Sequence, residues 1–259
     1  MFDSCATVTE NLIRPNYDPA PVVDRYRLMA TVTASPGTNS TRLKTMNTGT
    51  RNPQTQGRPG DHLSVVCFGA SAGGFEAYCT ILSLLPADTG MAYVIVHHQP
   101  ADGKSLLVEI LPRMTKMPVV LVADGESVKA NHVYVVPAGM QVTMDGDTFR
   151  LTPLVKPPGW PKNISIFLQS LADDRQKRAI AVILSGFDSD GAAALKSIKE
   201  AGGLVFAQEF QTARQPDMPQ SAVKTGCVDR LLSPTEIAAQ LGRIGEERAR
   251  FNNRKPGFG

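Results

Sequence analysis

Hydrophobic residues occur along the chain in short blocks that alternate between two spacings. Short unbroken apolar runs are typical of buried strands, and we expect them at residues 63–68, 91–96, 119–122, 180–184 and 204–207. Apolar residues that recur every three or four positions predict helices at residues 73–85, 103–113 and 192–201, and from residue 235 onward. Strands that alternate with helices over short connections predict an α/β fold, a doubly wound, mostly parallel sheet with helices on both faces.

One stretch in the middle of the chain has a different pattern. Three short strands are predicted close together, at residues 133–136, 141–144 and 148–152, and Asp145-Gly146 stands in the last turn. An Asp-Gly pair between alternating residues is a strong hairpin signal. We therefore expect a small antiparallel hairpin insert here.

The two ends of the chain differ from the middle. Residues 1–61 are rich in Thr, Asn, Gly, Pro and Arg and show neither hydrophobic period, which predicts a disordered leader. Residues 246–259 are predicted to be a polar tail. With 259 residues and 42% hydrophobic content, the chain can form one good core, which we assign to a single catalytic-size domain at residues 62–245.

Composition excludes several classes of function. A formal net charge of +3 leaves no electrostatic signature of a nucleic-acid partner. No apolar run approaches the roughly 20 residues that a membrane-spanning helix needs, and the acidic start of the chain is unlike a signal peptide, so a cytoplasmic protein is expected. The four cysteines lack metal-site or redox spacing and are expected to be buried, reduced thiols; no metal site is predicted.

Three reactive side chains follow three of the predicted strands. Ser71 follows the first strand in the stretch GASAGG, the pair His97-His98 follows the second, and Asp190 follows the strand at 180–184. Open α/β sheets bind ligands beyond the carboxyl ends of their strands, so these side chains are expected near one another. Serine, imidazole and carboxylate are the components of an acyl-transfer triad.

Each component would have a distinct task. Ser71 would attack as the nucleophile while an imidazole accepts its proton, and Asp190 would orient and stabilise that imidazole. The strand-to-helix turn also directs backbone N–H groups and the positive end of the helix dipole toward a developing oxyanion. Ala72 and Gly73 are the candidates for lining that oxyanion site.

Other interpretations fit parts of this pattern. GASAGG also satisfies the G-x-S-x-G motif of α/β-hydrolases, but that fold places its histidine last, whereas the final histidine here is His132. A dinucleotide-binding turn requires glycine in place of Ser71 and an acidic residue about 20 positions later. Ser71 and Asp190 could also be helix caps with no chemical role.

The sequence leaves open which histidine would serve. Consecutive residues of a strand point to opposite faces, so only one of His97 and His98 can face Ser71. His62 lies at the edge of the predicted leader and His132 precedes a predicted hairpin strand. Both are expected at the surface.

Five longer stretches, in order, carry a resemblance to a known family. They read GASAGGFEA, VIVHHQP, DGESVKANHVYVVPAG, AVILSGFDSDGAAALKSIKEAGG and FAQEFQTARQPDMPQSAVKTGCVDRLLSPTEIA. Together they resemble the catalytic domain of the chemotaxis protein-glutamate methylesterases, the CheB family. The resemblance covers about residues 63–241, and five stretches in order are far more specific than one motif.

The resemblance implies roles for individual residues. Ser71 would be the nucleophile, His98 the base and Asp190 the residue that orients it, while Phe187 would line the site and help to hold the oxyanion through its backbone. The implied reaction is hydrolysis of glutamate methyl esters on the cytoplasmic helices of chemoreceptors to glutamate and methanol, with deamidation of glutamine as a second activity. No cofactor is implied, and the implied partners are the receptors and a separate receiver or methyltransferase protein.

Some features depart from that family. Members usually carry a phosphoryl-accepting receiver domain, which residues 1–61 are too short and too polar to form. Phe187 and Asp188 replace smaller or apolar residues, and Asp188 adds negative charge where an acidic substrate would bind. These departures keep open a non-catalytic scaffold or sensor with the methylesterase fold, and also a broad carboxylester hydrolase.

Overall fold

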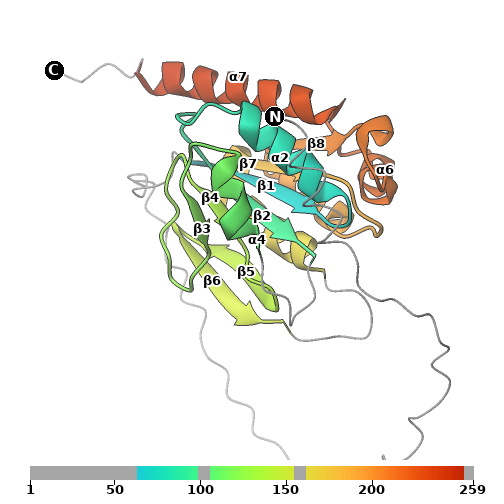
Figure 1. Ribbon diagram of the computed structural model, residues 1–259, viewed down its shortest axis with the longest axis horizontal. Helices are drawn as coiled ribbons and strands as arrows, with labels where there is room; N and C mark the ends of the chain where they lie inside the picture. Colours follow the sequence, from blue (N-terminus) through green and yellow to red (C-terminus); the bar gives the residue numbers. More distant parts are fainter. Residues whose placement is uncertain (1–62, 99–105, 155–161, 254–259) are drawn as a thin grey trace, which may run out of the picture. The chain divides into compact units, whose positions relative to one another are not determined.

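The computed structural model of the chain describes residues 63–98, 106–154 and 162–253 (Figure 1). The predicted leader at residues 1–61 and the last residues of the predicted tail lie outside this part. The beginning of the helix predicted at 103–113 also lies outside it.

A seven-stranded sheet forms the centre of the fold, in the order β3-β4-β2-β1-β7-β8-β9. Every neighbouring pair in it is parallel. Its strands are β1 (Ser64–Ala70), β2 (Met91–His97), β3 (Val119–Leu121), β4 (Val133–Val135), β7 (Ala179–Ile183), β8 (Leu204–Gln208) and β9 (Arg230–Leu232). All residues of β1 and β7 are buried, which explains their unbroken apolar sequences.

Helices cover both faces of the sheet. One face packs against α2 (Gly74–Leu84), α3 (Leu107–Ile110) and α7 (Pro234–Asn253), and Figure 1 shows α7 lying across α2. The other face packs against α4 (Asn163–Arg175), α5 (Leu195–Glu200) and α6 (Asp217–Lys224). Alternate residues of β1 point into the two cores, as the pleat requires: Val66 and Phe68 into the first, Val65 and Cys67 into the second. The predicted doubly wound α/β fold is confirmed.

A two-stranded antiparallel hairpin adds to the second face. It consists of β5 (Met140–Asp145) and β6 (Thr148–Pro153), and its turn contains Gly146 at a positive φ of 59°. The hairpin packs on α4, where the Met144 N–H donates to Ser170 Oγ at 3.1 Å. The expectation of a hairpin insert is confirmed for these two strands.

The third strand predicted for the insert was misplaced. The residues predicted as the strand 133–136 form β4, which lies in the main sheet, parallel to both β2 and β3. β4 is fully buried, whereas the hairpin strands alternate between buried and accessible positions. Its short apolar run fits either kind of sheet, and tertiary packing decides between them.

Several predicted elements have different limits. The helix predicted at 103–113 is α3 followed by the 3₁₀ turn η1 (Leu111–Arg113), and the helix predicted at 192–201 is the 3₁₀ turn η3 (Ala192–Ala194) followed by α5. Leu106, which lies within the first of these predicted helices, is exposed. The last helix continues to Asn253, so the first part of the predicted tail at 246–259 is helical.

Three elements were not predicted: α4, α6 and β9. The short 3₁₀ turns η2 (Gln176–Arg178) and η4 (Phe210–Thr212) were not predicted either. Of these, α4 has a clear signal, because Ile164, Phe167, Leu168 and Leu171 recur at helical spacing and are all buried. That helix proves important, because it holds Asp190.

The topology determines where the functional loops lie. The strands β2, β4 and β3 lie on one side of β1, whereas β7, β8 and β9, which come later in the chain, lie on its other side. The loops after β1 and β7 therefore leave the carboxyl edge of the sheet in opposite directions, which opens the crevice where α/β sheets bind ligands.

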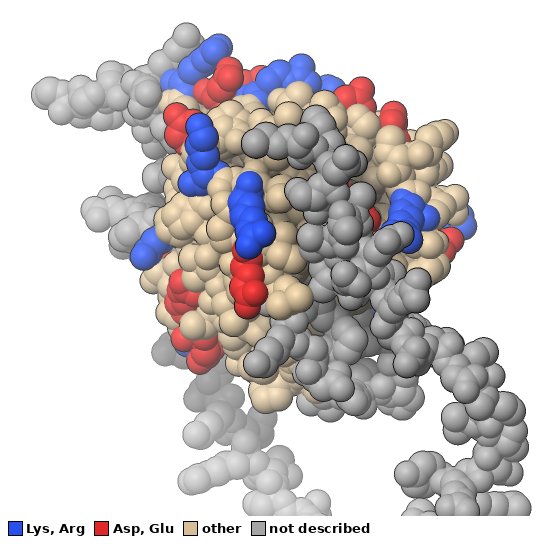
Figure 2. Space-filling model, in the orientation of Figure 1, with Lys and Arg blue, Asp and Glu red and all other residues tan. Residues whose placement is uncertain are grey.

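The outer surface gives little further indication of function. On the face shown in Figure 2, basic and acidic side chains are interspersed, in keeping with the small net charge of +3. Among the helices in the described ranges, none is long and apolar enough to cross a membrane.

Candidate active site

Ser71 lies in a tight turn that joins β1 to α2. Its N–H donates to the Ser185 carbonyl at 2.9 Å, and its own carbonyl accepts from the Gly74 N–H at 3.0 Å. Gly73 has a φ of +77°, and a Cβ there would lie 2.6 Å from Arg214 Cβ and 2.7 Å from Ser185 Oγ. The turn thus requires glycine after Ser71 for both conformation and space.

A second serine ties this turn to its neighbours. The Ser185 hydroxyl donates to the Ala72 carbonyl at 2.8 Å and accepts from the Gln215 N–H at 2.9 Å. The Ser185 N–H donates to Gln208 Oε1 at 3.0 Å. Ser185 and Gln208 are buried polar residues that join the loops after β1, β7 and β8. Sequence reasoning did not assign them a role, although Ser185 belongs to the SG pair of the fourth resembling stretch.

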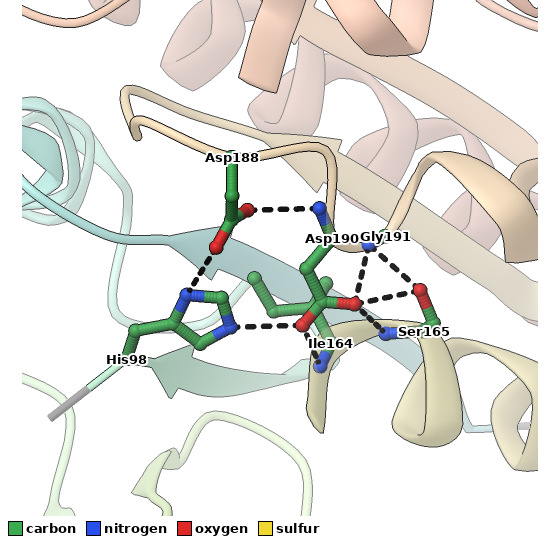
Figure 3. Close-up of polar contacts among 6 residues, drawn as sticks. All are labelled: His98, Ile164, Ser165, Asp188, Asp190 and Gly191. Atoms are coloured by element: carbon green, nitrogen blue, oxygen red, sulfur yellow. Dashed lines mark hydrogen bonds and ion pairs between the residues drawn. The ribbon is translucent and has the colours of Figure 1, made fainter. Parts of the chain in front are cut away.

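The structure separates the two histidines at the end of β2. The His97 ring meets the Tyr78 ring of α2 edge-on, with centroids 6.0 Å apart. Burial, together with the neighbouring His98, lowers the pKa of His97 to about 4. His98 lies on the opposite side and contacts Asp190 (Figure 3). Of the two candidates, His98 is therefore the one that meets the carboxylate.

Asp190 is held firmly at the start of α4 (Figure 3). Its Oδ1 accepts from the Ser165 N–H at 3.0 Å, the Ser165 hydroxyl at 2.6 Å and the Gly191 N–H at 2.7 Å. Its Oδ2 accepts from the Ile164 N–H at 2.8 Å and contacts His98 Nε2 at 2.8 Å. Burial alone would raise the pKa of Asp190, but these hydrogen bonds outweigh it and lower that pKa. Asp190 is therefore a fixed carboxylate anion.

The other ring nitrogen of His98 faces a second carboxylate. His98 Nδ1 lies 3.1 Å from Asp188 Oδ2, while Asp188 Oδ1 accepts from the Asp190 N–H at 2.8 Å. Burial lowers the pKa of His98, but Asp188 and Asp190 overcome that effect and raise the pKa to about 9. In this arrangement His98 carries a positive charge at neutral pH.

Ser71 and His98 come from adjacent strand ends. The His98 N–H donates to the carbonyl of Ala70, the residue before Ser71, at 3.1 Å. Among the described residues, however, no hydrogen bond joins the Ser71 hydroxyl to His98. The arrangement therefore contains the imidazole–carboxylate half of the predicted triad, with the serine beside it but not bonded to it.

The predicted oxyanion residues surround Ser71. Within the described ranges, the N–H groups of Ala72 and Gly73 make no hydrogen bond, so both are available to a ligand. Phe187 is 62% exposed, next to the buried Gly186. A Cβ at Gly186 would overlap Met218 Sδ and lie 2.9 Å from Ser71 Cβ, so the backbone before Phe187 passes directly against the serine.

A recess of about 380 Å³ lies next to the serine turn at Gly73. Polar side chains line it, among them Glu76, Gln208, Gln211 and Arg214. Arg214 Nη1 lies 3.6 Å from Glu76 Oε1, so charges of both signs face this space.

The remaining candidates lie away from this site. His132 lies just before β4, at the amino edge of the sheet, where it stacks on Tyr134; His62 is outside the described residues. Cys67 and Cys79 are buried thiols and Cys227 is half-buried, while Cys5 is outside the described ranges. In the described part of the chain, no group of His, Cys, Asp and Glu is arranged to bind a metal ion.

Comparison with known proteins points to one family. The family model for CheB methylesterase matches residues 66–241. The chain is 30% identical over 195 residues to "Protein-glutamate methylesterase/protein-glutamine glutaminase 3" of Geobacter sulfurreducens, covering 74% of this chain but only 53% of that relative. A Leptospira interrogans relative, provisionally named for the same two activities, is 33% identical over 186 residues, which are 71% of this chain and 96% of the relative.

A solved structure agrees with the sequence comparison. The crystal structure of the Thermotoga maritima CheB methylesterase catalytic domain superposes with a TM-score of 0.67 at 26% identity, covering 70% of this chain and 98% of that one. Ser71, His98 and Asp190 all fall within the matched residues 66–241. The chain therefore belongs to the CheB methylesterase family.

Proposed function

We propose that the chain is a serine esterase that hydrolyses glutamate methyl esters on the cytoplasmic helices of chemoreceptors, giving glutamate and methanol. We propose further that it acts in the cytoplasm and deamidates glutamine side chains at the same site. Family membership supports this reaction, and the observation that carries it is the buried His98–Asp190 pair beside the Ser71 turn.

The reaction proceeds in two halves. Ser71 Oγ attacks the ester carbonyl and gives its proton to neutral His98, forming a tetrahedral oxyanion. The oxyanion collapses, the bond to the methoxy oxygen breaks, and His98 returns the proton so that methanol leaves. A water molecule then attacks the acyl-enzyme, again losing its proton to His98, and glutamate is released from Ser71 Oγ, which recovers the proton.

The residues around Ser71 and His98 would assist both halves of this reaction. Asp190, fixed by backbone donors at the start of α4, orients the ring and stabilises its charged form. The unbonded N–H groups of Ala72 and Gly73, at the N-terminus of α2, are available to the oxyanion. The exposed Phe187 borders the site where the receptor helix would lie. A glutamine substrate follows the same course, with ammonia as the leaving group.

A second candidate function is a non-catalytic scaffold or sensor in the same signalling system. The observation that favours it is the contact of His98 Nδ1 with Asp188, which leaves the Ser71 hydroxyl without its base. A receiver protein or a methyltransferase would be partners in either case.

The experiment measures methanol release from methylated receptor membranes between pH 7 and pH 9.5. Turnover that disappears in Ser71→Ala, together with labelling of Ser71 by a fluorophosphonate probe, supports the esterase. If the chain releases no methanol over this pH range while another family member does so in the same assay, the esterase proposal is wrong. Binding to receptors that survives His98→Ala without labelling of Ser71 would favour the scaffold, and turnover of simple soluble esters alone would indicate a broader hydrolase.

A further inference from the structure

The imidazole of His98 lies between two carboxylates (Figure 3). Its Nε2 is 2.8 Å from Asp190 Oδ2, and its Nδ1 is 3.1 Å from Asp188 Oδ2. A neutral imidazole has one N–H and one lone pair, so it can donate to only one of these anions. An anion within ion-pair distance of each ring nitrogen is complementary to the imidazolium cation, which is protonated on both nitrogens.

The other groups around His98 do not change its preference for the charged, imidazolium form. The carboxylates of Asp188 and Asp190 both belong to the loop after β7, and Ser165 contributes only a hydroxyl from α4. His97, on β2, has a lowered pKa and is neutral at pH 7. Cys67, on β1, has a raised pKa and is also neutral. Within the described part of the chain, the two aspartates are therefore the charges that decide the state of His98.

The two carboxylates differ in how firmly they are held. Four donors besides His98 bind Asp190, and its side chain is 3% exposed. The Asp188 side chain is 21% exposed, and among the described residues its carboxylate contacts, apart from His98, only the Asp190 N–H, which donates to Oδ1. Rotation of the Asp188 side chain costs one backbone hydrogen bond near solvent, whereas Asp190 cannot move without disrupting the start of α4.

We propose that Asp188 is a positioning residue that holds His98 in a resting state, and that departure of its carboxylate from Nδ1 activates the esterase. This inference rests on the function proposed above. When Asp188 leaves, His98 releases the Nδ1 proton to water and keeps the Nε2–H on Asp190. The lone pair uncovered at Nδ1 then accepts the proton of Ser71 Oγ during attack.

The test compares Asp188→Asn with the wild type. Asparagine keeps an oxygen to accept from the Asp190 N–H, so the loop is retained while the charge beside His98 is removed. Asp88→Asn is the matched control, because Asp88 is exposed near the amino edge of the sheet and loses the same charge. A second variant, Asp188→Gly, removes the side chain altogether.

Two measurements decide the outcome. Methanol release at pH 7 should rise in both Asp188 variants, about tenfold for each unit by which the pKa of His98 falls, and the pH–rate profile should move to lower pH. The His98 pKa itself is measured by NMR titration and should fall in Asp188→Asn but not in Asp88→Asn. Thermal unfolding shows whether each variant is folded.

The outcomes that overturn the inference are distinct from failure of the esterase. If the wild type turns over but the Asp188 variants share its pH profile and its His98 pKa, Asp188 does not control the base and the esterase stands. If the Asp188 variants turn over more slowly than the wild type at every pH, Asp188 assists catalysis and the inference is also wrong. If wild type and variants are all inactive up to pH 9.5, the proposed function fails, and with it the activating role, even where NMR shows the His98 pKa falling.

Discussion

His97 and His98 show how strongly the surroundings of a residue decide its chemistry. They are adjacent in sequence and have the same intrinsic pKa, yet burial lowers one pKa to about 4 and two carboxylates raise the other to about 9. The alternation of side chains at the end of β2 is sufficient to separate them. Only the residue that faces the loop after β7 contacts Asp190, the carboxylate that would orient a catalytic base.

The low pKa of His97 predicts a dependence of stability on pH. Since its folded pKa lies below the unfolded value near 6.5, its contribution is complete above pH 6.5 and is lost as the pH falls toward 4. We expect the free energy of unfolding of the wild type to fall by about 1–2 kcal/mol more than that of His97→Gln between pH 7 and pH 5. Urea denaturation at the two pH values measures this difference. Equal losses in both proteins would contradict the prediction.

Ser165 is predicted to support the fixed carboxylate. Its hydroxyl donates to Asp190 Oδ1 at 2.6 Å and accepts from the Gly191 N–H at 2.8 Å. Ser165→Ala removes both bonds and should destabilise the fold by about 1–3 kcal/mol. It should also lower methanol release, because Asp190 would orient His98 less precisely. Ser83→Ala, which removes an exposed hydroxyl on α2, is the control in the same denaturation and turnover assays and should change neither result.

At the scale of residues, the sequence predicted the positions of the site residues better than the contacts between their side chains. Ser71, His98 and Asp190 were expected at three strand ends, and the structure brings His98 and Asp190 into contact next to the turn that carries Ser71. The contact between Asp188 and His98 was not expected. Strand order determines which loops meet, but the pairing of side chains within a loop depends on rotamers that no sequence period encodes.

At the scale of elements, apolar patterns predicted buried strands well and their partners less well. β1, β2, β7 and β8 were predicted within a few residues, because a short apolar run buried on two faces has few alternatives. β4 was assigned to the hairpin because its neighbours in sequence are hairpin strands, whereas its neighbours in space are β2 and β3. Pairing is a tertiary property, so the sequence left it open.

The loop after β7 makes a close contact with α6 that can be tested. Gly186 lies against Ser71 Cβ and Met218 of α6, and its carbonyl accepts from the Met218 N–H at 3.0 Å. Gly186→Ala should destabilise the fold by about 1–3 kcal/mol through overpacking and slow the labelling of Ser71 by a fluorophosphonate. Because Met218→Ala removes the larger clash, the losses in the double variant should be smaller than the sum of the losses in the two single variants. A double variant no better than the sum of the single variants would show that the clash is not the cause.

For the whole molecule, two cores on opposite faces of one sheet should unfold together. Cys67 belongs to one core and Cys79 to the other, and both are buried. In a variant with Cys5 and Cys227 replaced by serine, a thiol reagent should modify both remaining cysteines at one rate, set by global unfolding. Mass spectrometry of the labelled peptides measures the two rates. Faster modification of either cysteine would reveal independent opening of one face.

The position of β1 has a consequence for how the polypeptide is made. β1 pairs with β2 on one side. Its other neighbour, β7, comes much later in the sequence, so Val65 cannot pair with Ala179 until that residue has been synthesised. A nascent chain that leaves the ribosome therefore carries a bare apolar strand edge from the synthesis of β1, which ends at Ala70, until β7 is made from Ala179 onward. Chaperones that shield such edges would protect this protein from aggregation during its synthesis.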